Sequence, residues 1–532
     1  MIQPQTQKPA YWGAGFALSD SDIEQIYNHF LEMARPQTTA QIARVIIAHR
    51  VAEERNQVAR QLAGRLVYQP KNAYKIGDQL VFPALGFAHG EVTAVREGYN
   101  PQYDTFPVVA VEIKGKTMEF AADLDAEHAL NSGDVKALSG MEPVDLDELY
   151  DLYETAVAPT IQQTLHDHKS FVYLNGVWFV KELMAEVNIG HLHLSEAILE
   201  MSGGGPLRVD EIAPHLDMDP GLDPAVQAFS LNYGLLHDAR FDEVAPLDQI
   251  AWFLRRMEPE GATKTPERLQ YSPIPYDNAL LSPQLLALER ELDDEWSGLD
   301  SAFGPGSAPP QTAVFTLLYP HRWSGVMPLS ARLRPFFPPS ASPRQRVIFV
   351  DELSGDEIVG WVVQEQRYIY GLGDWYEANG IPIGGFVHIK PGPEPGIISL
   401  GYDQRGAKRE WVRLATAVDN RIKFDLKRRA VGCGFDDLMI VGTDVVTAID
   451  ALWRRADSHQ RSVASLLAEI FPELAKANPQ NTVHAKTLYS AINMLRRVPP
   501  GPLFAELVRH PAFQSVGDHY WQFDQNRWQK DS

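Results

Sequence analysis

Between residues 65 and 121 the sequence changes from a helical to a strand-forming pattern, and this change constrains the fold more than any other feature. Short apolar segments follow one another there, separated by Gly, Asn and Pro at intervals of about ten residues. The segments are RLVY, DQLVFP, HGEVTAVREG, FPVVAVEIKG and KTMEFA. Because closing a sheet on itself removes unpaired strand edges, five such strands predict a small β-barrel over 67–122.

A helical pattern precedes this segment. In residues 20–62 apolar side chains recur at helical spacing, and Ser19 or Ser21 is placed to cap the first helix, which Pro36 ends. The pattern predicts a helical N-terminal region over 1–66.

The strand-rich segment that follows resembles the SH3-like barrels attached to transcription and nucleic-acid proteins, so the resemblance implies a nucleic-acid context.

One strand of this segment, VVAVEIKGK, places Glu112 and Lys114 in the spacing of metal-dependent nucleases of the PD-(D/E)xK type. Side chains alternate along a strand, so the two are expected on one face. Such a nuclease also needs an aspartate on a neighbouring strand, for which Asp104 is the near candidate, and an α/β core. A surface ion pair produces the same spacing, and the barrel-like neighbours favour that interpretation.

Residues 191–258 have the order of a winged helix, with three short helices followed by two strands. Three motifs support this interpretation, namely GGPL, DEIAPHL and a closing RFDEV…W-x-L. Through them the segment resembles the HARE-type winged helices and the winged domain of the RNA polymerase delta subunit. In winged helices the third helix commonly enters the major groove of DNA. Here that helix offers Gln227, Ser230, Asn232 and His237 but no Lys or Arg, so both a protein and a nucleic-acid partner remain open.

Residues 461–524 repeat this order, and the closing pattern of Phe513, Val516 and Trp521 resembles that of the first copy. Unlike the first copy, the helix predicted over 483–497 carries basic and polar side chains. We therefore predict that this copy contacts nucleic acid. The predicted contacts are Lys486, Tyr489, Asn493, Arg496 and Arg497.

A β-rich pattern fills residues 313–400, after a Gly/Pro/Ser-rich linker at 298–312. It resembles the DNA-binding pseudobarrel shared by plant transcription factors and some restriction-enzyme effector domains. The residues at matching places are Trp375, Tyr376, Asn379, Ile381 and Gly384. In that family these positions are structural, so the resemblance implies a fold and a DNA partner without naming the base-reading side chains.

The most basic stretch is QRGAKREWVRLATAVDNRIKFDLKRRA at 404–430, in which Trp411 and Phe424 are interleaved with cations. This combination is typical of surfaces that contact phosphates. A solvated amphipathic segment explains the pattern equally well. The predicted contacts are Lys408, Arg409, Arg413, Arg421, Lys423, Lys427, Arg428 and Arg429.

The net charge of −21 does not exclude a nucleic-acid partner, because the acid is concentrated in one block. Residues 123–300 hold 34 Asp or Glu against 10 Lys or Arg, whereas residues 401–532 hold 15 against 19.

A single cysteine, Cys433, rules out an internal disulfide and a cysteine-based metal centre. No leader or membrane-spanning pattern is evident, so a cytoplasmic location is expected.

A chain of 532 residues is too long for one hydrophobic core, and these patterns together predict a multidomain α+β protein. The predicted order is a helical N-terminal region (1–66), an SH3-like small β-barrel (67–122), an acidic helical region (123–190), a winged helix (191–258), a linker with one helix (259–312), a β-rich pseudobarrel-like domain (313–400), a basic helical segment (401–457) and a C-terminal winged-helix-like domain (458–532).

The sequence contains no phosphate-loop, zincin, serine-hydrolase or dinucleotide-binding signature, so we expect no cofactor and no metal. The first hypothesis is a non-enzymatic protein that binds nucleic acid, duplex DNA in particular, in a regulatory or genome-defence role. The alternative is a protein–protein scaffold, or a nucleic-acid mimic, that acts through the acidic block 123–300. The third is a metal-dependent nuclease that uses Glu112 and Lys114.

Overall fold

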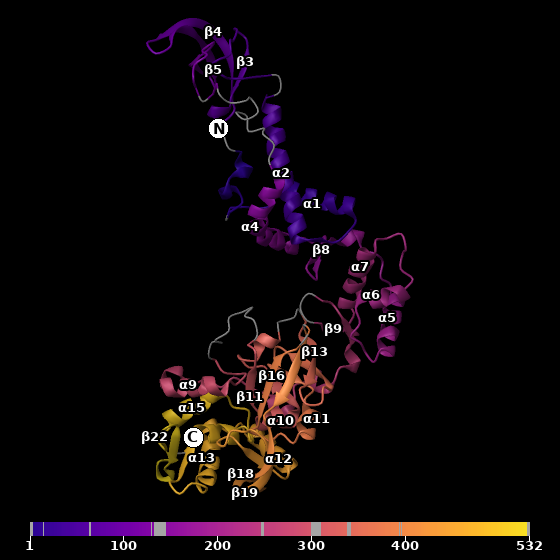
Figure 1. Ribbon diagram of the computed structural model, residues 1–532, viewed down its shortest axis with the longest axis vertical. Helices are drawn as coiled ribbons and strands as arrows, with labels where there is room; N and C mark the ends of the chain where they lie inside the picture. The colour runs from indigo at the N-terminus through magenta and orange to yellow at the C-terminus, as the bar shows by residue number, and fades with distance from the viewer. Residues whose placement is uncertain are drawn as a thin grey trace. The chain divides into compact units, whose positions relative to one another are not determined.

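The computed structural model describes residues 4–528 except 14, 63–64, 129, 132–144, 246–248, 299–309, 338–341, 393 and 395 (Figure 1). The chain is a mixture of helices and sheets, as the sequence predicted. It forms two compact units, of which the first holds Met1–Val187 and Asp217–Tyr233 and the second holds Asn188–Leu216 and Gly234–Ser532. Within the described part of the chain, no helix combines the length and the apolar content that crossing a bilayer requires.

The first unit is built on helices that pack against a small sheet. Its elements are α1 (Asp20–Met33), β1 (Gln37–Thr38), α2 (Thr39–Leu62), α4 (Leu146–Asp167), β7 (Phe171–Leu174) and β8 (Val177–Val180), and the sheet order is β1-β8-β7. Ser19 caps α1 as predicted, and Asp22 completes a capping box. Phe30, Ile46 and Phe179 lie in the shared core.

The predicted strand-rich segment is inserted between α2 and α4. Its strands are β2 (Leu66–Val67), β3 (Gln79–Phe82), β4 (Ala88–Asn100), β5 (Asp104–Ile113) and β6 (Lys116–Ala121), in the order β2-β3-β4-β5-β6. The sheet is curled, as the contact of Tyr68, which directly follows β2, with the distant strand β6 shows. Its hydroxyl donates to the carbonyl of Ala121 at 2.7 Å, and its ring lies 5.3 Å from that of Phe120. All five strand predictions coincide with observed strands.

Among the described residues one order of elements, helix–strand–helix–helix–strand–strand, occurs three times. In the C-terminal copy the elements are α13 (Val463–Ala475), β21 (Thr482–His484), α14 (Ala485–Ile492), α15 (Pro500–Arg509), β22 (Phe513–Gly517) and β23 (Tyr520–Phe523), with sheet order β21-β23-β22. The N-terminal elements α1, β1, α2, α4, β7 and β8 follow the same order, and again the last strand lies in the middle of the sheet. The sequence did not predict this N-terminal copy.

The middle copy has the predicted three helices and two strands. They are α5 (Ile189–Met201), α6 (Val209–Ile212), α7 (Pro224–Leu236), β9 (Phe241–Glu243) and β10 (Trp252–Leu254). Leu207 forms a bridge with Trp252 and so takes the place of the first strand. The predicted domain 191–258 is nevertheless not confined to one unit, because most of α7 groups with the first unit. There Phe229 packs edge-on against Phe179, with ring centroids 5.6 Å apart.

The predicted β-rich domain is a seven-stranded sheet. Its strands are β11 (Ala313–Thr316), β12 (Val326–Pro328), β13 (Arg344–Asp351), β14 (Glu357–Val363), β15 (Tyr368–Tyr370), β16 (Phe386–Pro391) and β17 (Ile397–Tyr402), in the order β11-β16-β17-β13-β14-β15-β12. Two short helices, α10 (Tyr319–Ser324) and α11 (Gly373–Ala378), accompany it. Trp375 and Tyr376 of the predicted motif are buried, and the Tyr376 hydroxyl donates to the carbonyl of Val326 at 3.1 Å.

The basic segment predicted as helical over 401–457 begins instead with a long β-hairpin. Strands β18 (Gln404–Val418) and β19 (Arg421–Cys433) pair antiparallel, and β20 (Val441–Thr443) joins the free edge of β18. The turn residues Asp419 and Asn420 both have positive φ, which a two-residue hairpin turn requires. Helix appears only from α12 (Val446–Ser458). The prediction was wrong because Lys and Arg residues stand between the alternating apolar residues. The two-residue period of a strand was therefore not recognised in the sequence.

The linker region 259–312 holds the short α8 (Glu260–Thr263) and the longer α9 (Pro283–Leu292). Leu285 and Leu288 of α9 belong to the same apolar core as Leu503 and Phe504 of α15, so α9 covers α15 (Figure 1). The greater part of the predicted Gly/Pro linker lies outside the described residues.

Candidate nucleic-acid interface

The predicted contact residues fall in two different environments. Eight of them lie on the hairpin β18–β19, here called the ribbon, and five lie on or just after α14. The first set is largely exposed, whereas the second is largely buried.

The ribbon carries exposed cations on both of its faces. Directly opposite residues of an antiparallel pair point to the same face. Arg428 lies opposite Trp411 on one face, and Lys427 lies opposite Val412 on the other. Every residue from 425 to 430 on β19 is exposed, so this part of the ribbon meets solvent on both sides.

Few of these cations are neutralised by neighbours. From Gln404 to Cys433 the ribbon holds nine Lys or Arg against three Asp or Glu. Two of the exposed cations are paired, Arg405 with Asp403 at 2.6 Å and Arg429 with Asp444 at 2.7 Å. The other exposed cations form no ion pair with any described residue, and they are Lys408, Arg409, Arg421, Lys423, Lys427 and Arg428. Such a surface attracts polyanions.

The ribbon is held at its turn by the C-terminal copy. Ile422 and Phe424 are buried in the core that α13 shares, and the Ile422 amide donates to Glu469 of α13 at 3.3 Å. Arg413 is half-buried and donates to the carbonyl of Asp437 at 2.9 Å, while burial lowers its pKa. Arg413 therefore supports the ribbon from inside instead of extending its surface.

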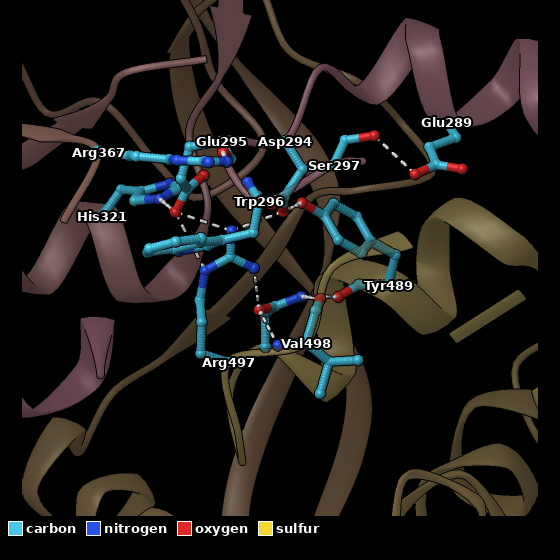
Figure 2. Close-up of polar contacts among 11 residues, drawn as sticks. Glu289, Asp294, Glu295, Trp296, Ser297, His321, Arg367, Tyr489, Arg497 and Val498 are labelled. Carbon is cyan, nitrogen blue, oxygen red and sulfur yellow. Dashed lines mark hydrogen bonds and ion pairs between the residues drawn. The ribbon is translucent and has the colours of Figure 1, made fainter. Parts of the chain in front are cut away.

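The second set enters a buried ionic cluster, defined as Asp294, Glu295, His321, Tyr489 and Arg497 (Figure 2). Arg497 Nη2 lies 2.6 Å from Asp294 Oδ2 and 2.8 Å from Glu295 Oε1. His321 Nε2 lies 3.1 Å from the same Glu295 oxygen, and the Tyr489 hydroxyl donates to Asp294. The cluster joins the segment after α9, helix α10 and the segment around α14.

Burial dominates the electrostatics of this cluster. It would by itself raise the pKa of Glu295, but Arg497 and His321 hold that pKa well below its usual range. For Arg497, burial works against the charged form, and the two carboxylates more than offset it, so its pKa is raised. Arg497 also donates to Asn493 Oδ1 at 3.0 Å. The three predicted contacts Tyr489, Asn493 and Arg497 thus have internal partners and present no surface to a ligand.

The remaining two members of the second set also have partners. Lys486 pairs with Glu291 at 2.5 Å and with Asp436 at 2.8 Å, and Arg496 donates to the carbonyl of Arg461 at 2.7 Å. We therefore do not carry the second set into the candidate interface. Apolar side chains surround this helix, which is the pattern of a buried helix and was the signal available in the sequence.

Sequence reasoning missed the acidic half of the buried cluster. The stretch DDEW at 293–296 was grouped with the acidic block as a surface feature. In the structure Arg367 lies with its guanidinium 4.9 Å from the Trp296 ring centroid and donates to the Glu295 carbonyl at 2.9 Å (Figure 2). The nearby Trp was the one hint that these acids are buried.

The nuclease alternative gains no geometric support. Strand β5 ends at Ile113, and Lys114 has a φ of 49° in the following turn, so it does not continue the face of Glu112. Asp104 begins the same strand, eight positions from Glu112, which corresponds to roughly 26 Å along an extended chain. Glu112 lies opposite Glu91 and Thr117 instead. These three predicted residues therefore do not converge.

No protein-family model matches the chain, and neither does any curated protein or solved structure. Among the described residues, no group of three or more His, Cys, Asp or Glu side chains is placed to hold a metal ion. Cys433 is 3% exposed, and burial raises the pKa of its thiol to about 11, which suits a packing residue better than a nucleophile. The ribbon, with its exposed cations, is therefore the candidate functional surface.

Proposed function

We propose that this chain is a non-enzymatic nucleic-acid-binding protein whose contact surface is the ribbon β18–β19. The observation that carries the proposal is the set of exposed cations on both faces of the ribbon that lack described acidic partners. A two-stranded ribbon fits the major groove of B-DNA, and cations on its two faces would meet the phosphates of both groove walls. Duplex DNA is thus the proposed partner, in a regulatory or genome-defence role.

The three copies of the helix–strand–helix–helix–strand–strand order support this class of protein, because winged helices have that order and recur in DNA-associated proteins. Their third helices are not proposed to read DNA. In the C-terminal copy α15 is covered by α9, and a side chain at Gly501 would meet the Tyr276 hydroxyl. In the N-terminal copy the exposed start of α4 is acidic, with Asp147, Glu148 and Asp151. The C-terminal copy instead supports the ribbon, through the core that α13 shares with Ile422 and Phe424.

The acidic start of α4 favours a second candidate function for the first unit. Three exposed carboxylates within its first two turns, with exposed Leu152 beside them, suit a basic protein partner. We propose this docking role for part of the acidic block 123–300, in addition to the DNA contact of the ribbon. Capture of a partner by the wild-type chain, and its loss on D147N/E148Q/D151N, would test it.

The DNA-binding proposal is tested by fluorescence anisotropy with the full chain and a labelled duplex. We expect binding at about 50 mM salt that weakens steeply toward about 200 mM, because counterions are released from the phosphates. The variant K427A/R428A/R429A should bind more weakly at every salt concentration and should reduce the slope of log K against log salt by about 2–3. Absence of binding by the wild-type chain at low salt and micromolar protein would refute the proposal.

A matched control is available in the curled sheet of the first unit. Arg96 is an exposed arginine on strand β4, paired with Glu119 on β6. The variant R96A removes one exposed cation outside the ribbon. It should leave both the affinity and the salt slope at wild-type values. An equal loss in R96A and in a single ribbon variant such as R428A would mean that the ribbon has no special part in binding.

A further inference from the structure

A hollow opens on one side of the ribbon, between its strands and the loop that follows β19. Its volume is about 490 Å³. It is lined by Glu410, Trp411, Arg413, Leu426, Phe435 and Asp437. The hollow thus combines two aromatic rings with a rim of charge, on the face of the ribbon that also carries Arg409 and Arg428.

Trp411 is the unusual member of this hollow, because 60% of it is exposed. The guanidinium of Arg428 lies 5.8 Å from its ring centroid, and Arg428 Nη2 donates to the carbonyl of Arg409 at 3.1 Å. These contacts fix the Arg428 guanidinium against the indole on the ribbon surface. Arg428 therefore lies over part of the indole, and the remainder of this largely exposed ring is open to a ligand beside cations.

The opposite wall is built and held in place. Arg413 Nη1 donates to the Asp437 carbonyl at 2.9 Å, which joins the loop to β18. The neighbouring Asp436 is tied down by Lys486 at 2.8 Å. Phe435 and Asp437 are therefore presented on a fixed segment, and a ligand that enters the hollow would meet walls that need little ordering.

We propose that this hollow receives one unstacked nucleobase, which stacks on Trp411 while the flanking phosphates meet Arg409 and Arg428. This inference rests on the proposed function and deepens it by naming the form of nucleic acid. A base inside a regular duplex cannot reach an indole, whereas a base in a single strand or an unpaired position can. The ribbon then has two modes, phosphate contact with any strand and stacking with an unpaired base.

The choice of a base over other ligands follows from the chemistry of the walls. A flat aromatic surface next to several cations matches a planar base attached to an anionic backbone. The carboxylate of Asp437 is exposed at the rim and can accept from an exocyclic amino group. A purely apolar ligand would leave the cations of this face without a counter-charge.

The test compares a short single-stranded DNA with a duplex of the same length, using the full chain and the variants W411A and W411F. We expect W411A to weaken single-strand binding by about ten-fold or more, because stacking on an aromatic side chain contributes that order of affinity per base. Duplex binding should change by less than about two-fold, since phosphate contacts remain. W411F should retain most of the single-strand affinity. The variant V418A, on the same strand but outside the hollow, is the matched control and should behave as wild type.

A second readout does not depend on affinity. A single-stranded DNA that contains 2-aminopurine should lose fluorescence on binding the wild-type chain, and should keep it on binding W411A under saturating conditions. If nucleic acid binds but W411A leaves both readouts unchanged, the hollow is not a base site while the proposed function stands. If the wild-type chain binds neither DNA form, the proposed function itself fails. Equal loss for single strand and duplex in W411A would also overturn the base site.

Discussion

Removing Arg497 from the buried ionic cluster should destabilise the second unit strongly. The side chain is fully buried with Asp294 and Glu295, and it lies 2.6 and 2.8 Å from their oxygens. Replacing it by leucine leaves two buried carboxylates with His321, the Tyr489 hydroxyl and the Trp296 amide as hydrogen-bond partners, and none of these replaces the guanidinium charge that both carboxylates share. Breaking a buried ion pair by removing one partner typically costs about 3–5 kcal/mol. We therefore expect R497L to lower the local unfolding free energy by that amount.

Hydrogen exchange measured by mass spectrometry is the suitable assay, because it reports local opening in a chain with several modules. Peptides that cover 293–297 and 485–498 should exchange roughly a hundred- to several-thousand-fold faster in R497L, since about 1.4 kcal/mol corresponds to a factor of ten. The variant D294N/E295Q/R497L removes all three charges and should recover much of the loss.

The control for this prediction is K476A, which removes an exposed lysine paired with Glu473 within the same C-terminal copy. Exposed pairs contribute little to stability, so K476A should leave exchange in these peptides unchanged. The reasoning is refuted if R497L exchanges at the wild-type rate, or if the triple variant is less stable than R497L. The second result would mean that the charges themselves, and not the unpaired carboxylates, decide stability.

Three further predictions concern buried titratable groups. Burial, together with Asp242, raises the pKa of Glu258 from 4.5 to about 8, so stability should fall as pH rises from about 4.5 to about 8, and E258Q should flatten this dependence in urea unfolding. Burial, with His519 and Lys486 as lesser causes, lowers the pKa of His484 from 6.5 to about 4. Stability should therefore fall as pH drops from about 6.5 to about 4, and H484N should reduce that fall. Cys433 should react with a thiol reagent only in denaturant; rapid reaction of the native chain at pH 8 would contradict its burial.

Local signals in the sequence were sufficient for much of the fold. Ser19 is followed by Asp22 at capping-box spacing, and the helix starts there. The strands between 66 and 121 are short, alternate in polarity and are separated by Gly and Asn, so their positions were predictable. The order of the C-terminal copy was also recognisable, because its closing aromatic residues repeat those of the middle copy.

Long-range relations were not predictable in this way. The N-terminal copy is interrupted by the five-stranded sheet, which separates α2 from α4 in sequence. Its repeat order is therefore visible only when β1 is seen to pair with β8. Similarly, Arg497 looks like a surface cation until Asp294, about two hundred residues earlier, is seen beside it.

Within the candidate site, the exposure of the cations was predicted correctly for one segment and wrongly for another. The cations of 404–430 were expected on a surface, and most are exposed, although on a hairpin instead of a helix. Those of 483–497 were expected on a surface too, yet Tyr489 and Arg497 are buried. Composition alone does not separate these cases. The difference lies in the apolar positions between the cations, which alternate in the first segment and surround the helix in the second.

The most direct test of the central claim is to map the protein residues that DNA touches. The full chain, bound to DNA that carries a photoreactive base, is cross-linked and the modified peptides are identified by mass spectrometry. We expect the cross-links within Gln404–Val418 and Arg421–Cys433, and we expect K427A/R428A/R429A to reduce their yield. Cross-links confined to other parts of the chain, such as the sheet over 66–121 or helix α4, would contradict the assignment of the ribbon as the nucleic-acid interface.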